Sequence, residues 1–179
     1  QVAAMDASSG KVLWRYTVGG RIDTPPTIYG NLCLFGSRDG WVYCLRADDG
    51  RLAWRFRAAP KERRIIAFGQ LESAWPAIGS VLVQNDQVYF SVGRSSAVDG
   101  GMFVYEVNPI TGKQKWRRNL IGYTAAYPKF QEGIPCVASP LIMDGQTLIL
   151  GSVGLDSKTG HNARGNEWRS SLLDRGWRH

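Results

Sequence analysis

The residues best able to recognise a ligand lie in two stretches near the middle of the chain, Ile65 to Trp75 and Gly93 to Gly101. Both stretches are polar insertions between predicted strands. An arginine beside carboxylates and hydroxyls can bind a carboxylate, a sugar or a peptide. An ordinary loop, in which an ion pair of Arg94 with Asp99 or Glu72 only fixes the shape, is the favoured interpretation. The candidate ligand-binding residues are Gln70, Glu72, Ser73, Arg94, Ser95, Ser96 and Asp99.

Patterns that carry catalysis are few in this sequence. The two histidines, His161 and His179, lie where the repeat described below is lost, so no Ser-His-Asp arrangement or His-rich metal cluster fits inside the repeats. The stretch Gly151 to Gly154 lacks the lysine and the helix of a phosphate-binding loop. Asp48 and Asp49 sit in a turn, where such side chains usually accept hydrogen bonds from backbone amides rather than bind calcium. We therefore predict no catalytic residue and no metal site.

Two of the three cysteines are candidates for a cross-strand pair. If Gly36 and Trp41 close the turn between their strands, Cys33 lies opposite Cys44. In an oxidising compartment the two thiols could form a disulfide, and otherwise they are two small buried side chains.

The elements that must position these residues come from a phrase that occurs three times, at Met5–Trp14, Leu45–Trp54 and Val107–Trp116. In each copy a turn ending in glycine reverses the chain, and a strand that contains the tryptophan follows. A repeated unit of this size cannot bury its apolar face alone and must stack on its copies. The residues expected to dock the units on one another are Asp6, Gly10, Trp14, Asp48, Gly50, Trp54, Asn108, Gly112 and Trp116.

Short apolar runs between turn signals predict four antiparallel strands in each unit. The runs are Pro26–Tyr29, Leu32–Phe35, Trp41–Leu45, Pro76–Gly79, Val81–Val83, Val88–Ser91, Met102–Val107, Ser139–Ile142 and Leu148–Ser152. Even strand spacing with one glycine and aromatic motif per sheet is typical of an all-β fold, the β-propeller. In the family that the chain resembles, which is named below, a closed ring needs about seven or eight four-stranded blades, and this chain supplies three to four. We expect a partial β-propeller over residues 1–155, part of a longer protein, and an irregular tail or the start of a further blade over residues 156–179.

The stretch Gly36-Ser37-Arg38-Asp39-Gly40-Trp41-Val42-Tyr43, together with the repeated glycine and tryptophan, resembles the repeat of quinoprotein-like β-propellers, also called PQQ-like repeats. That family includes quinone-dependent alcohol and glucose dehydrogenases, the lipoprotein scaffold of outer-membrane protein assembly, and secreted or periplasmic bacterial propellers without known activity. Glu72–Pro76 and Gly93–Ser96 look most like the last group. The dehydrogenases of the family use two adjacent cysteines beside the quinone, and this chain has no adjacent pair. The resemblance therefore implies no cofactor here, with pyrroloquinoline quinone (PQQ) and calcium possible only in the full-length protein.

The leading functional hypothesis is a non-catalytic scaffold that presents its loop faces to a protein or polysaccharide partner, in a periplasmic or secreted location. Its other partners are the remaining blades of its own chain. One alternative is a fragment of a PQQ-dependent dehydrogenase whose cofactor residues lie outside this chain. A sensor propeller attached to a kinase or another enzyme is a third possibility. Because no chemical group is in place, we expect the chain not to be an enzyme.

The charge of the chain does not point to another class of partner. The net charge is +7. No apolar run approaches the length of a membrane-spanning helix, so no transmembrane segment is predicted. A basic surface could attract nucleic acid or an anionic membrane. No nucleic-acid-binding motif accompanies it, so we favour a solvated strand and loop and expect no nucleic-acid partner. The basic residues are Arg55, Arg57, Lys61, Arg63, Arg64 and the stretch Arg164 to Arg178.

Overall fold

A computed structural model describes residues 1–122 and 137–163, which contain fifteen strands and no helix. In these two ranges there is accordingly no helix that could span a membrane. The predicted all-β class with four-stranded antiparallel sheets is confirmed. His179 and the stretch Arg164 to Arg178 lie outside the described residues.

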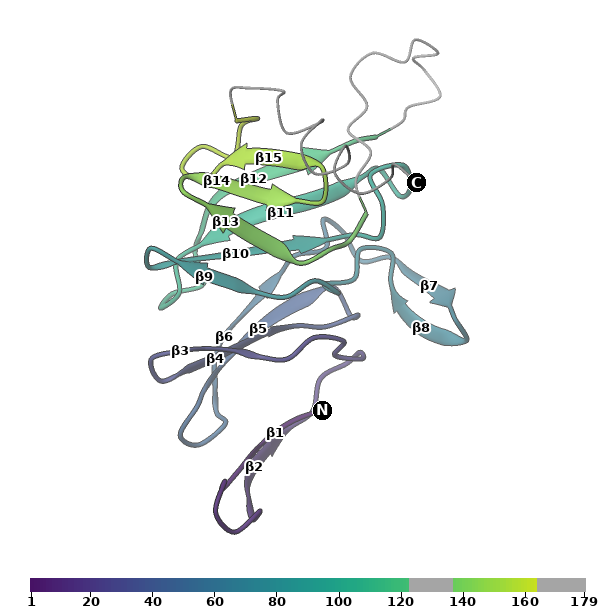
Figure 1. Ribbon diagram of the computed structural model, residues 1–179. Coiled ribbons are helices and arrows are strands. Elements are labelled where there is room, and N and C mark those ends of the chain that lie inside the picture. Colours follow the sequence, from purple (N-terminus) through teal and green to yellow (C-terminus); the bar gives the residue numbers. More distant parts are fainter. Residues whose placement is uncertain (123–136, 164–179) are drawn as a thin grey trace, which may run out of the picture.

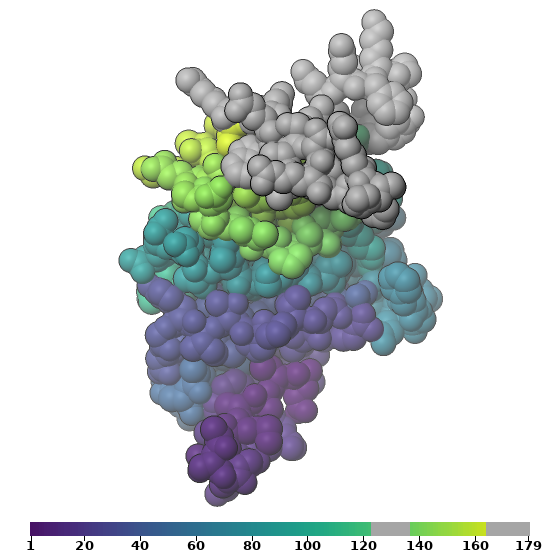
Figure 2. Space-filling model, in the orientation of Figure 1, coloured from purple at the N-terminus to yellow at the C-terminus, as the bar shows by residue number. Residues whose placement is uncertain are grey.

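Four antiparallel sheets stack in chain order, from the N-terminal sheet at one end to the C-terminal sheet at the other (Figures 1 and 2). Two are complete blades of four strands, flanked by a two-stranded sheet before them and a three-stranded sheet after them. The sheets are β1 (Val2–Met5) with β2 (Val12–Tyr16); β3 (Thr27–Tyr29), β4 (Leu32–Gly36), β5 (Trp41–Arg46) and β6 (Leu52–Arg57); β9 (Leu82–Gln84), β10 (Gln87–Val92), β11 (Met102–Val107) and β12 (Gln114–Leu120); and β13 (Leu141–Asp144), β14 (Thr147–Leu150) and β15 (Val153–Asp156). A separate hairpin of β7 (Arg64–Ala67) and β8 (Gln70–Ser73) projects from the stack.

The expected strand at Pro76–Gly79 does not form, because this segment crosses beside the loop after β4 instead of joining a sheet. Ala77 N donates to Ser37 O at 3.0 Å, and Gly93 N donates to Pro76 O at 3.1 Å. The segment therefore links two blades, and its blade begins only at β9.

The hydrophobic core lies between neighbouring sheets. One buried cluster joins the two four-stranded blades, where the rings of Phe56, Phe90 and Tyr105 lie 5.2 to 5.6 Å apart. A second cluster joins the third and fourth sheets, and a third cluster joins the first and second. Each sheet is thus buried only by its neighbours, as stacked repeats require.

The tryptophan of each phrase docks onto the glycine turn of the next sheet. Trp14 Nε1 donates to Ala47 O at 2.9 Å, and Trp54 Nε1 donates to Pro109 O at 2.7 Å. A Cβ on Gly112 would lie 2.7 Å from the Trp54 ring. The φ of this glycine is also positive, at 66°. Only glycine fits both the space and the backbone here, so the ring seals one blade against the turn of the following blade.

A fourth copy of this turn, which the sequence analysis missed, lies at Asp156 to Gly160. Trp116 Nε1 donates to Ser157 O at 3.0 Å, and its ring lies against Gly160. No tryptophan follows Gly160 at the spacing of the other copies, because residue 164 is an arginine. The first eight residues assigned to the tail therefore belong to the repeat.

Asp48 caps its turn as expected, because its Oδ1 accepts a bond from Asp49 N at 2.8 Å, but it does not stand at the position of Asp6 and Asn108. Asp6, Asn108 and Asp156 lie four residues before their turn glycines, and each side chain accepts two backbone N–H bonds. The residue at this position in the second turn is Arg46, whose Nε donates to Asp49 Oδ1 at 3.0 Å. In the other turns the residue just before the glycine donates its hydroxyl to the Asp or Asn oxygen four residues before the glycine. The second turn keeps a hydrogen bond between the same two positions, but its donor and acceptor are exchanged.

The predicted pairing of Cys33 with Cys44 is also wrong. Ser37 N donates to Trp41 O at 3.0 Å, so the loop between β4 and β5 is one residue shorter than we expected. Gly40, with a positive φ of 85°, completes this loop. The shift pairs Cys33 with Leu45 and Cys44 with Leu34. A one-residue shift reverses the face of every side chain, so the two free cysteines are buried in different clusters.

Candidate functional site

The main polar cluster of the structure surrounds the carboxylate of Glu72. Glu72 lies on β8, and its side chain is only 1% exposed. Arg38, in the loop after β4, donates from Nη1 to Glu72 Oε2 at 2.7 Å. Arg94, which follows β10, donates to the other carboxylate oxygen. One carboxylate thus joins corresponding loops of two successive blades.

A second acid extends this cluster toward the first sheet. Arg38 Nε lies 2.6 Å from Asp23 Oδ2, and Arg21 Nε lies 2.7 Å from Asp23 Oδ1. Arg94 also donates to the carbonyls of Ala74 and Ser73, at 3.0 Å and 3.2 Å. The guanidinium groups of Arg38 and Arg94 are therefore already bound within the protein.

The balance of burial and pairing sets the charge of Glu72. Burial by itself raises the pKa of this carboxyl group, but hydrogen bonds from Arg38 and Arg94 outweigh it, so the net pKa of Glu72 lies below its usual value. Burial likewise lowers the pKa of Arg38, and its pairing with Glu72 and Asp23 more than restores it. Both groups are ionised at neutral pH.

The other residues of the predicted ligand site do not converge on one point. Ser73 Oγ accepts a bond from Trp75 N at 3.1 Å, and Ser95 Oγ accepts one from Ala97 N at 3.2 Å. Gln70 is exposed on β8, and the carbonyl of the buried Ser96 accepts a bond from Gly122 N at 2.8 Å. Asp99 pairs with Arg63 at 2.9 Å, whereas Arg94 pairs with Glu72, one of the two acids considered for it. The structure brings Glu72, Ser73 and Arg94 together and leaves Gln70 exposed on β8 and Ser95, Ser96 and Asp99 in a neighbouring loop.

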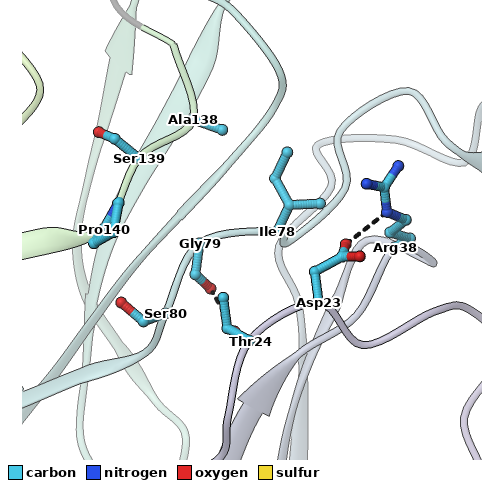
Figure 3. A pocket seen from close by; sticks show the side chains of 9 residues that line it. All are labelled: Asp23, Thr24, Arg38, Ile78, Gly79, Ser80, Ala138, Ser139 and Pro140. Carbon is cyan, nitrogen blue, oxygen red and sulfur yellow. Dashed lines mark hydrogen bonds and ion pairs between the residues drawn. The ribbon is translucent and has the colours of Figure 1, made fainter.

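A pocket that sequence reasoning missed lies beside this cluster, with a volume of about 280 Å³ (Figure 3). Three of the segments that line it enter the innermost strands of their sheets, β3, β9 and β13, and Arg38 comes from the loop after β4. Thr24, Gly79 and Ser139 occupy equivalent positions, five residues before the last paired residue of their strands. Aligning the inner strands is the signal that could have found the pocket. Its lining residues are Asp23, Thr24, Arg38, Ile78, Gly79, Ser80, Ala138, Ser139 and Pro140.

The walls of the pocket combine hydroxyls with a charged edge. Thr24 Oγ1 donates to Gly79 O at 3.4 Å, and the Asp23–Arg38 pair closes one side (Figure 3). Ser139 Oγ is buried and has no hydrogen-bond partner among the described residues. The volume lies just below that of typical small-molecule sites, about 300 to 1,000 Å³. The described pocket can hold a small polar group or one end of a larger ligand.

Comparison with known proteins places this architecture. A family model described as outer membrane protein assembly factor BamB, built on PQQ-like repeats, matches residues 1–168. The chain belongs to this PQQ-repeat family. Its sheets are therefore blades of a β-propeller. The fold is similar to that of a solved structure, a quinohemoprotein alcohol dehydrogenase from Pseudomonas putida. The two structures align with a TM-score of 0.68 at 16% identity, over 90% of this chain and 30% of that one.

Two curated relatives of this PQQ-repeat chain are named as dehydrogenases. The 1-butanol dehydrogenase (quinone) of Thauera butanivorans is 28% identical over 137 residues, and the quinoprotein alcohol dehydrogenase PedH of Pseudomonas putida is 30% identical over 130 residues. Each match covers 68% of this chain and 20% of the relative. The chain thus spans about a fifth of the length of these relatives.

The described residues do not by themselves fit PQQ. The quinone is polyanionic, and the two partly buried arginines that could receive it, Arg38 and Arg94, are already paired with Glu72 and Asp23. Across residues 1–122 and 137–163, no group of three or more His, Cys, Asp or Glu side chains could hold a metal ion. A complete cofactor site would need residues from outside the described part.

Proposed function

We propose that this chain supplies consecutive blades to a PQQ-dependent alcohol dehydrogenase, and that most residues contacting the cofactor lie elsewhere in the full-length protein. The observation that carries the proposal is the similarity, over two thirds of the chain, to two quinone-dependent alcohol dehydrogenases. This similarity supports the dehydrogenase alternative better than the non-catalytic scaffold that we favoured from the sequence.

In this proposal the blades have two tasks. The tryptophan turns hold the curvature of the ring, and the entries of β3, β9 and β13 form part of the wall around its axis. Ser139 Oγ and the Asp23–Arg38 pair are the polar groups that this wall offers to a ligand. The paired arginines keep a fixed geometry, which suits a wall more than a group that must rearrange.

The experiment is a calorimetric titration of the full-length protein with PQQ in the presence of calcium, followed by dye-linked oxidation of primary alcohols. We expect saturable binding and alcohol-dependent dye reduction that needs both additions. Ser139→Ala should weaken PQQ binding severalfold, whereas Ser9→Ala on an exposed turn is the matched control. No heat of binding and no dye reduction would contradict the proposal.

The non-catalytic scaffold remains the second candidate, with a protein or polysaccharide partner at its loop faces. It is favoured by one observation, that the charged cluster of Glu72, Arg38, Arg94 and Asp23 is satisfied internally. If the protein is a scaffold, neither the wild type nor Ser139→Ala should bind PQQ, and the two titrations should be identical. A periplasmic or secreted location belongs to both candidates and is supported by the family description, which names an outer-membrane assembly factor. Cell fractionation of the full-length protein tests it.

A further inference from the structure

The hairpin of β7 and β8 carries an exposed apolar tip that the blades do not need. It leaves the stack sideways in Figure 1 and forms a separate lobe in Figure 2. Ile66 and Leu71 are paired across its two strands, so their side chains share one face. Ile66 is 79% exposed, Leu71 is 60% exposed, and Phe68 in the connecting turn is 87% exposed.

The backbone of the turn shows that the aromatic ring is held outward at a conformational cost. Phe68 has a positive φ of 51°. This left-handed conformation is rare for a bulky side chain and common for asparagine or glycine. Strain of this kind clusters at active sites, ligand clamps and switch regions. An ordinary turn residue would close the same hairpin with less strain, so closing the hairpin does not explain the phenylalanine.

The base of the hairpin is fixed to the body of the protein. Glu72 is clamped by Arg38 and Arg94, and Ser73 N donates to Arg38 O at 2.8 Å. Ile65 packs against the core between the two complete blades. The tip is therefore presented on a rigid stalk, and little conformational freedom is lost when it binds.

Four cationic side chains, which we call the collar, lie in the segment that enters this base: Arg57, Lys61, Arg63 and Arg64. Between Arg57 and Leu71 the chain has four cations and one acid, Glu62. Glu62 is shared by Arg57 at 3.7 Å and Arg64 at 3.0 Å, and Arg63 pairs with Asp99 at 2.9 Å. The side chains of Arg57, Arg63 and Arg64 remain 39% to 59% exposed. Two acids thus face four cations, and the collar keeps a positive charge.

We propose that this hairpin docks onto an anionic lipid surface, with Ile66, Phe68 and Leu71 entering the interface and the collar contacting lipid headgroups. Exposed apolar side chains flanked by lysine and arginine are the combination that binds at such interfaces. The long arginine side chains can extend from the base toward the headgroups while the apolar tip inserts. An apolar groove on a protein would take the tip but gives no role to the positive collar.

The test is co-sedimentation of the full-length protein with vesicles of phosphatidylcholine alone or mixed with anionic phosphatidylglycerol. We expect binding to the anionic vesicles, weaker binding to the neutral ones, and loss of binding as salt rises. Phe68→Asn should lower the partition coefficient about 10- to 100-fold, the effect of removing one buried aromatic side chain. Asparagine accepts the left-handed turn, so thermal unfolding should be unchanged.

Ile110→Ser is the matched control. Ile110 is 67% exposed on the turn at residues 108–112, outside the hairpin, so its loss should leave vesicle binding unchanged. Arg64→Gln should weaken binding to anionic vesicles only. Failure of the wild-type protein to bind anionic vesicles, equal binding to both vesicle types, or an equal effect of Phe68→Asn and Ile110→Ser would overturn the proposal. The first of these results would leave a protein groove as the partner of the tip.

Discussion

The docking turns and the Glu72 cluster join the same sheets in two different ways. Each docking turn uses an indole that fills a gap over glycine and donates to a carbonyl oxygen of the turn. The Glu72 cluster occurs once among the described residues and joins two partly buried arginines through one carboxylate. The hydrogen bond inside each turn can exchange its donor and acceptor, because Arg46 donates from the position at which Asp6 accepts. The Glu72 cluster depends on one negative charge, so we expect mutations in the turns and in the cluster to reduce stability by different amounts.

The largest expected effect is that of Trp54→Ala. The Trp54 ring is buried between the two complete blades, and the mutation removes both its packing and its bond to Pro109 O. Truncation of such a residue should lower the free energy of unfolding by about 3 to 5 kcal/mol. Urea unfolding measures this loss. The Trp14 ring is more exposed, so Trp14→Ala should lower the free energy of unfolding by less. Equal losses at both positions would show that burial does not control the contact.

Glu72→Gln should have the next largest effect. It leaves Arg38 and Arg94 facing each other without a carboxylate, and breaking a buried pair in this way costs about 3 to 5 kcal/mol. Because both arginines are partly exposed and Arg94 keeps two carbonyl acceptors, we expect about 2 to 3 kcal/mol in urea unfolding. Asp99→Asn, which removes the partner of the half-exposed Arg63, is the control and should cost less than about 1 kcal/mol. A similar small loss for both variants would mean that Glu72 is not electrostatically important.

The same substitution should also change the response to acid. The pKa of Glu72 is lowered in the folded protein, so its stabilisation is complete above the unfolded value of about 4.3 and is lost as the pH falls below it. The stability difference between wild type and Glu72→Gln should therefore narrow below that pH. Thermal unfolding from pH 6 to pH 3 measures this difference. A stability difference that stays constant from pH 6 to pH 3 would show that the Glu72 carboxylate does not titrate in this range.

Features marked by a repeated side chain could be predicted from the sequence, whereas features that depend on counting residues in a loop could not. Trp14, Trp54 and Trp116 identified three turns, but the turn before Gly160 was missed because Arg164 stands where the tryptophan would be. Whether Cys33 and Cys44 share a face of their sheet depends on the length of the loop between β4 and β5. That loop is one residue shorter than expected, which places the two side chains on opposite faces.

The two parts of the candidate site differ in the same respect. Glu72 and Arg94 could be selected from composition because they are polar residues in insertions. Arg38 was not selected, since it lies inside the motif of the repeat and its partner is 34 residues away. The pocket of Thr24, Gly79 and Ser139 needed three inner strands to be aligned, and these strands share no residue type at the lining position. Chemistry at a single residue was thus easier to predict than convergence of segments.

The smallest expected effect concerns the turn at residues 108–112, which is capped by the amide of Asn108. Asn108→Ala removes the acceptor for Ile110 N and Thr111 N and should cost about 1 kcal/mol, as the loss of a capping side chain does. Asn108→Asp keeps the acceptor and should change stability at neutral pH by less than about 0.5 kcal/mol.

The aspartate variant should differ from wild type only in acid. Hydrogen bonds from Ser8 and Ser9 lower the pKa of the equivalent Asp6 to about 2, and the pKa of Asp156 is lowered by bonds from Thr159. The pKa of a carboxylate at position 108 should be lowered in the same way, so its contribution would be present above about pH 4 and lost as the pH falls toward about 2. Urea unfolding of Asn108→Asp and wild type at pH 7 and pH 3 tests this. Parallel curves at both pH values would show that the capping position does not sense its charge, and the turn would then depend on the tryptophan alone.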